Sequence, residues 1–171
     1  MHPFLLLLPA FLQTLPAPPV VDAKTLPQVP GPISPKGPDL AGGPGCDPIQ
    51  MALRRSARKG NIPAIGLPEG PLELQDALSD LPGWKAYRID VPAKATVKVR
   101  LKGAHEAWFR VRAMNRWGEL EQGMLQNRIP TGNPEASYIN PKSERNSVFF
   151  VVESTEASMG GEPFSLFVTY P

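Results

Sequence analysis

Short apolar runs separated by turn residues constrain this chain more than any other feature of its sequence. Between Gly66 and Pro171 lie the runs LELQDAL, WKAYRIDV, ATVKVRL, EAWFRVRAM, SYIN, SVFFVVES and FSLFVTY, and the segments between them are rich in Pro, Gly and Asn. Runs of this length and punctuation are typical of strands, and no long amphipathic helix interrupts them. We therefore predict an all-β fold over residues 66–171, an antiparallel β-sandwich or jelly roll.

Alternation within these runs assigns side chains to the two sides of each strand. The side predicted to face the core carries Tyr87, Ile89 and Val91, then Val97, Val99 and Leu101, then Phe109, Val111 and Ala113. The opposite side is strongly basic. The run VFFVV is apolar on both sides, which predicts a central, covered strand.

The order of these motifs resembles the bacterial pre-peptidase C-terminal domain over residues 67–171. The resemblance is carried by LPEGPLELQDAL, GWKAYRIDVPAKATVKVRL, SYINPKSERNSVFFVVES and PFSLFVTYP. It implies an extracellular β-sandwich of a kind usually appended to secreted proteases, whose members in some cases bind matrix polymers or calcium. Here no peptidase precedes the domain, Lys94 stands where glycine is common, and the middle loops lack an Asp-rich pattern.

The N-terminus predicts export. Residues 4–15, FLLLLPAFLQTL, are long enough for the apolar part of a signal peptide and too short to cross a bilayer. We expect a signal peptide over residues 1–23 with cleavage after Ala23, because a cut after Ala17 would place Pro18 immediately downstream. No later stretch is long and apolar enough for a membrane span, so we expect a secreted or periplasmic product.

Residues 24–46 predict a disordered, proline-rich spacer, since 12 of the 22 prolines fall within the first 48 residues. A proline-motif ligand is the alternative interpretation. Cys46, the single cysteine, excludes an internal disulfide and is either a free thiol or a partner in a disulfide between chains.

Residues 47–60, DPIQMALRRSARKG, predict a short basic helix that Asp47 caps and Gly60 ends. The cations near its end suit the helix dipole. A contact with an acidic lipid or polymer is the alternative.

Residues for catalysis are scarce. His105, the one histidine outside the leader, lies in a predicted turn, and no nucleophile motif, phosphate loop or clustered His/Cys metal site occurs. We expect no enzyme activity, no metal and no cofactor. The acids Glu69, Glu73, Asp76 and Asp80 leave calcium or paired-carboxylate chemistry open, although their spacing matches no calcium loop.

Charge is the more informative signal for binding. Residues 85–116 carry nine basic and two acidic side chains, whereas the segments on either side are acidic. If the three basic strands lie side by side, their outer side chains, Lys102 among them, form one surface with Trp108 as a stacking side chain, and Trp117 in a loop is a second stacking candidate. The candidate ligand-binding residues are Arg88, Lys98, Arg100, Trp108, Arg110, Arg112, Arg116 and Trp117.

Two interpretations of this charge remain open, a solvated outer face neutralised by the acidic segments and a site for a polyanion. We predict a non-catalytic binding or adaptor module for an anionic extracellular polysaccharide or envelope component. Nucleic acid is a poor choice of polyanion outside the cell. The alternative is a structural or assembly protein of the envelope or secretion machinery that binds another protein.

Overall fold

The computed structural model of the protein describes residues 16–31, 63–78, 84–104, 109–116, 134–154 and 161–171. The predicted helix 47–60, the apolar part of the leader, Cys46, His105, Trp108 and Trp117 lie outside these ranges. Within them, no helix is long and apolar enough to cross a membrane.

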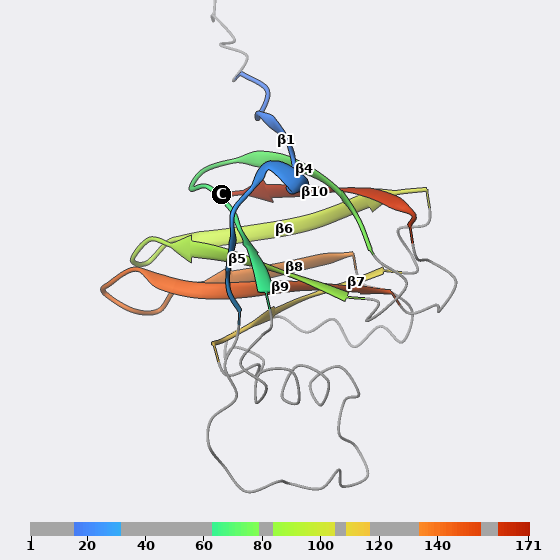
Figure 1. Ribbon diagram of the computed structural model, residues 1–171. Coiled ribbons are helices and arrows are strands. Elements are labelled where there is room, and N and C mark those ends of the chain that lie inside the picture. The colour runs from blue at the N-terminus through green and yellow to red at the C-terminus, as the bar shows by residue number, and fades with distance from the viewer. Residues whose placement is uncertain (1–15, 32–62, 79–83, 105–108, 117–133, 155–160) are drawn as a thin grey trace, which may run out of the picture.

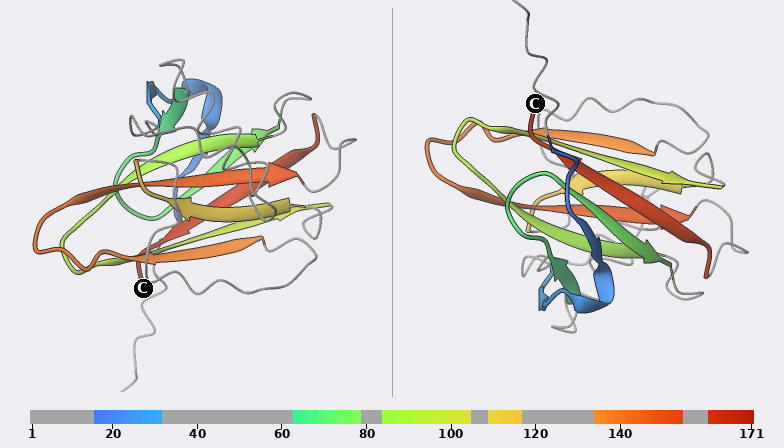
Figure 2. Two further views of the ribbon diagram at one scale, coloured as in Figure 1. Left: turned by 90° about the horizontal axis from the view of Figure 1, so that it is seen from below. Right: turned by 90° about the horizontal axis from the view of Figure 1, so that it is seen from above.

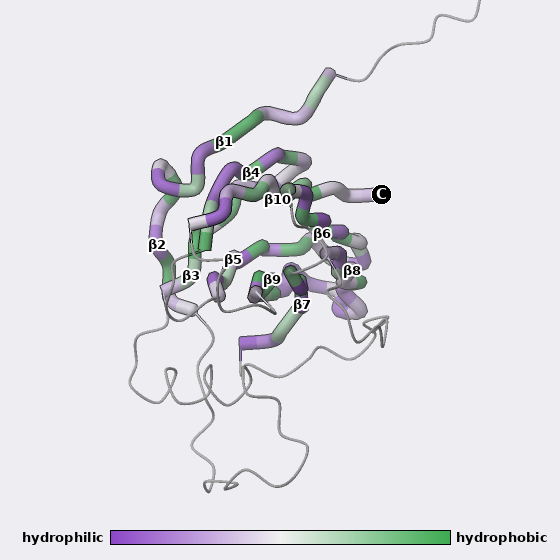
Figure 3. Tube along the Cα trace, turned by 90° about the vertical axis from the view of Figure 1, so that its right-hand side faces the viewer, coloured by the Kyte–Doolittle hydropathy of each residue, from purple (hydrophilic) through white to green (hydrophobic). Residues whose placement is uncertain are grey.

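In the described residues, ten strands form two five-stranded sheets that pack face to face as a β-sandwich (Figure 1). Sheet A has the order β1-β4-β10-β6-β8 and comprises Val20–Asp22, Leu72–Ala77, Pro163–Thr169, Thr96–Gly103 and Glu135–Ile139. Sheet B has the order β2-β3-β5-β9-β7 and comprises Gln28–Pro30, Pro63–Gly66, Trp84–Val91, Asn146–Ser154 and Phe109–Met114. Figure 3 shows the two sheets as two rows of strands. The predicted fold class is confirmed; all pairings are antiparallel except the short pairs β1–β4 and β3–β5.

The core lies between the two sheets and is built by the alternation that the sequence predicts. Tyr87, Ile89 and Val91 of β5 meet Val97, Val99 and Leu101 of β6 there, with apolar residues from β4, β7, β8, β9 and β10. β9 is covered on both sides, since Phe149 and Val151 pack with Trp84, Ala86, Met114 and Ala64 in a second cluster on the outer side of sheet B. The covered strand predicted from VFFVV is thereby confirmed.

The stretch GWKAYRIDVPAKATVKVRL, with two alternating runs around a short turn, predicts a hairpin, but this prediction is wrong because β5 and β6 do not pair. β5 pairs with β9 in sheet B, and β6 pairs with β10 and β8 in sheet A, so the turn at residues 92–95 carries the chain from one sheet to the other. Asn140 holds this turn: its side-chain amide donates to the carbonyls of Val91 and Pro92, and its backbone N–H donates to Ala95. Lys94 adopts φ 59°, the left-handed region that favours glycine.

The sandwich also begins earlier than the predicted boundary at residue 66. β1, the 3₁₀ turn η1 (Ala23–Thr25) and β2 come from the predicted leader and spacer, and they join the edges of both sheets. In both views of Figure 2 this blue segment lies beside green strands at one edge of the sandwich. Strands of three residues need no long apolar run, and prolines are tolerated on edge strands, so the composition of this segment did not reveal them.

Candidate ligand-binding face

The exposed side of β6 presents three cations in a row. Lys98, Arg100 and Lys102 alternate with the buried Val97, Val99 and Leu101, so they project from the outer side of sheet A. Residues two apart along a strand are separated by about 7 Å, which sets the spacing of the charges. We call Lys98, Arg100 and Lys102, with Phe167 and Ile139, the basic face.

Neighbouring strands complete this face. Arg100 lies opposite Phe167 of β10 on one side and opposite Glu135 of β8 on the other. The ammonium group of Lys102 lies 5.2 Å from the centre of the Phe167 ring, a cation–π contact. Ile139 of β8, the last strand of sheet A, leaves 56% of its surface exposed. The face therefore combines charge with exposed apolar and aromatic surface.

The cations of the basic face differ in their partners. Lys98 pairs with Glu135 at 2.8 Å, and both side chains are well exposed, so the pair contributes little to stability. Arg100 is exposed, and among the described residues it has neither an ion pair nor a side-chain hydrogen bond. Its guanidinium can therefore offer a carboxylate, sulfate or phosphate two parallel hydrogen bonds without first breaking a contact within the described sandwich.

The other predicted arginines lie on the opposite side of the molecule. Arg88 in β5 and Arg110 and Arg112 in β7 project from the outer side of sheet B, because β5 and β7 belong to that sheet. The assumption that the three basic strands lie side by side is wrong for this reason. The structure divides the predicted basic surface between two opposite faces of the sandwich.

Arg110 and Arg112 converge on Glu153 of β9, which is 2% exposed. Arg112 donates to Glu153 Oε1, and Arg110 Nε lies 3.4 Å from the same oxygen. Burial raises the pKa of Glu153, and the charges and hydrogen bond of the two arginines only partly offset this effect. Both arginines thus form ion pairs with a buried acid.

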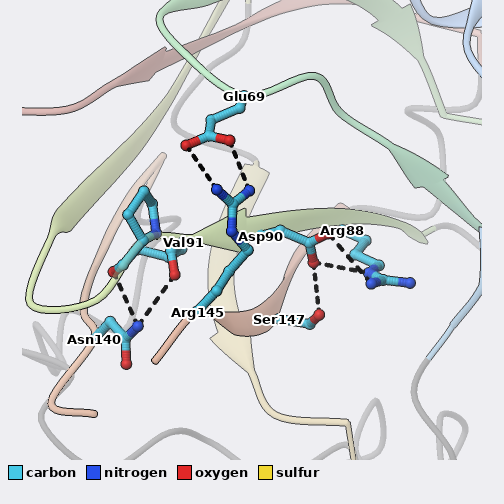
Figure 4. A network of polar contacts seen from close by, with 8 residues as sticks. Glu69, Arg88, Asp90, Val91, Asn140, Arg145 and Ser147 are labelled. Carbon is cyan, nitrogen blue, oxygen red and sulfur yellow. Dashed lines mark hydrogen bonds and ion pairs between the residues drawn. The ribbon is translucent and has the colours of Figure 1, made fainter. Parts of the chain in front are cut away.

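Arg88 is also paired. Its Nε donates to Asp90 Oδ1 at 3.1 Å, and Ser147 Oγ donates to the same oxygen at 2.6 Å (Figure 4). Partial burial acts to raise the pKa of Asp90, but the hydrogen bonds from Ser147 and Arg88 and the nearby positive charges outweigh it, so the pKa lies below its ordinary value. Arg116 follows β7 and is exposed.

Two of the four acidic residues that left calcium open, Glu69 and Asp76, form ion pairs in the structure. Glu69 forms a two-pronged pair with Arg145, and Asp76 accepts from Lys85 and from the hydroxyl of Tyr87 (Figure 4 for Glu69). Asp80 lies outside the described residues. No group of three or more His, Cys, Asp or Glu side chains suited to a metal ion occurs in the described part of the chain.

Phe167 was not among the residues that the sequence predicts for this site. Alternation places Phe167 on the side of β10 away from the core, where a single apolar side chain is not unusual. Its meaning depended on knowing that β10 lies beside β6.

Comparison with known proteins found no matching family model and no matching curated protein. Among solved structures, the chain is similar to PliG of Aeromonas hydrophila, a periplasmic inhibitor of g-type lysozyme, with 14% identity, a TM-score of 0.42 and coverage of 63% of this chain and 96% of that one. It is also similar to the pre-peptidase C-terminal domain of a collagenase from Bacillus anthracis, with 11% identity, a TM-score of 0.41 and coverage of 64% and 99%. The second structure belongs to the family that the sequence motifs resemble.

Proposed function

We propose that this protein is an exported, non-catalytic binding module whose basic face binds an anionic glycan of the envelope or extracellular matrix. The observation that carries the proposal is Arg100, an exposed guanidinium without an ion pair among the described residues, flanked on β6 by Lys98 and Lys102. The arginines of sheet B are held by Asp90 and Glu153, which leaves the basic face as the better cationic surface.

The shape and chemistry of the basic face suit an extended polyanion. A row of cations about 7 Å apart can contact successive negative groups along a chain. Phe167 adds an apolar surface beside Arg100 on which the face of a sugar ring can pack. Because the charges are exposed, such binding should weaken steeply with added salt.

Catalysis is not part of the proposal. Asp76 is paired with Lys85 and Tyr87, and Glu69 is paired with Arg145, so both carboxylates are held in structural contacts. A screen of the purified protein for hydrolase activity should give only background.

The decisive experiment measures binding to a panel of acidic and neutral polysaccharides by isothermal titration calorimetry at increasing salt. We expect an acidic glycan to bind, and Arg100→Glu to weaken its affinity about tenfold or more, as loss of a charge-assisted hydrogen bond implies. Lys24→Glu is the matched control, since it makes the same charge change at an exposed residue of η1. An affinity that does not change with added salt, or an equal loss of affinity in both variants, would contradict the proposal.

A second candidate function, assembly with another envelope protein, is supported by Ile139. This exposed residue lies on β8, which ends sheet A, and an edge strand offers unpaired backbone groups to a partner. Affinity capture from envelope extracts with the wild type and Ile139→Lys tests it. Recovery of a stoichiometric protein by the wild type alone would favour this function.

A further inference from the structure

Residues Pro19 to Pro30, here called the strap, tie the two sheets together at one edge. In sheet A, β1 pairs with β4, so that Val20, Val21 and Asp22 lie opposite Glu73, Leu74 and Gln75. After η1 the chain enters sheet B, where β2 pairs with β3. The strap therefore spans the sandwich (Figures 1 and 3).

The strap also contributes to the hydrophobic core. Ala23 belongs to the main core cluster and is only 4% exposed, and Val21 and Leu26 pack against the same cluster. Asp22 caps η1, since its side chain accepts from the Lys24 N–H at 2.9 Å and its carbonyl accepts from the Thr25 hydroxyl at 2.7 Å.

Backbone contacts hold both ends of the strap. The N–H of Glu73 donates to the Pro19 carbonyl and the N–H of Gly66 donates to the Pro27 carbonyl, both at 2.9 Å. A Cβ at Gly66 would lie 3.0 Å from Val29 Cγ1, so the glycine permits β2 to approach closely.

A cut after Ala23 would divide this unit. Leaders are removed during export, before a domain folds. Burial of Ala23 in the folded protein therefore does not itself protect the peptide bond after Ala23 from cleavage. The product, however, would lack β1, the Asp22 cap and a core residue, and it would leave β4 as an unpaired edge.

We propose that the strap is retained in the mature protein and that processing occurs upstream of Val20. Residues 16–19 are exposed and precede β1, so a cut at or before them would leave β1 intact. This inference rests on the export that the proposed function assumes. It replaces Ala23, the cleavage site that the sequence alone favoured.

The first test exports the full chain through a bacterial secretory route and identifies the first residue of the product by intact mass and N-terminal sequencing. A first residue after Met1 and no later than Val20 supports the inference. A product that begins after Val20 overturns it. A product that still begins with Met1 would overturn both this inference and the export that the proposed function assumes. Glycan binding by the basic face is measured in a separate experiment, so the two failures can be told apart.

The second test compares two substitutions in the full chain by thermal unfolding. Val21→Asp places a charge against the core and should lower the Tm by roughly 10 °C or more. Val20→Asp is the matched control, because Val20 is 59% exposed on the same strand, and its Tm should stay within about 2 °C of the wild type. A Tm within about 2 °C of the wild type for both variants would show that the strap adds nothing to the fold.

Discussion

Tyr87 donates its hydroxyl hydrogen to Asp76 Oδ2 over 2.8 Å, and this bond joins the two sheets from within the sandwich. Lys85 pairs with the other oxygen of the same carboxylate. Burial raises the pKa of Tyr87 well above its ordinary value, and the negative charge and hydrogen bond of Asp76 raise it further. Both groups are therefore positioned for structure, with the tyrosine neutral.

Removal of the Asp76 carboxylate should lower the free energy of unfolding more than removal of the Tyr87 hydroxyl. We expect Tyr87→Phe to lower the free energy of unfolding by about 1 kcal/mol, since one hydrogen bond is lost and the ring remains. Asp76→Ala should cost about 2 to 3 kcal/mol, because it leaves the buried hydroxyl without its acceptor and Lys85 without its partner. Urea denaturation of the two single variants and the double variant measures the coupling. Strictly additive losses would contradict a direct bond.

Ionisation of Asp90 should make the folded protein more stable at neutral pH than in acid. Its folded-state pKa lies below the ordinary 3.8, so the ionised form stabilises the fold above that pH. The advantage of the wild type over Asp90→Asn should therefore be full at neutral pH and shrink as the pH falls through 3.8 and below. Urea denaturation across this range measures it. An advantage that grows in acid would mean that partial burial outweighs the Arg88 and Ser147 contacts.

Ionisation of Glu153 should instead make the folded protein less stable as the pH rises. Its folded-state pKa lies above the ordinary 4.5, so the folded protein holds its proton to a higher pH than the unfolded chain does. Relative to Glu153→Gln, the wild type should lose stability as the pH rises from 4.5 through the raised pKa, and then level off. A gain over the same interval would show that Arg112 and Arg110 dominate over burial.

Asn140 should be a demanding position for substitution. Its side-chain amide donates to the carbonyls of Val91, Pro92 and Glu144, and its side-chain oxygen accepts from the backbone N–H of Lys142. We expect Asn140→Ala to cost about 2 to 4 kcal/mol, since several buried backbone groups lose their partner. Asn140→Asp should cost more, because a carboxylate would face three carbonyl oxygens.

Thermal unfolding of the two Asn140 variants measures these effects. The control is Lys142→Ala in the same loop. Its exposed side chain donates a hydrogen bond to Asn146, and its loss should cost less than about 0.5 kcal/mol. Similar losses for Lys142→Ala and Asn140→Ala would show that the loop, and not the buried amide, holds the turn between the sheets.

The candidate site was only partly predictable. Alternation assigned Lys98 and Arg100 correctly to the outside of their strand, and it did the same for Arg88, Arg110 and Arg112. It could not tell that Glu153, more than forty residues away from Arg110 along the chain, lies opposite that arginine in the sheet. Ion pairing across strands depends on register, which leaves no mark on the sequence of either strand alone.

Binary patterning by itself determined the fold class and the inward residues of this protein, because burial on one side of a strand requires apolar residues at every second position. Tertiary structure alone decided which strands pair. Tyr87 and Val97 would point into the same core whether β5 and β6 belonged to one sheet or to two facing sheets. The buried side-chain amide of Asn140 holds the turn that places the two strands in facing sheets. That choice left Arg100 on an open face and placed Arg110 beside a buried acid.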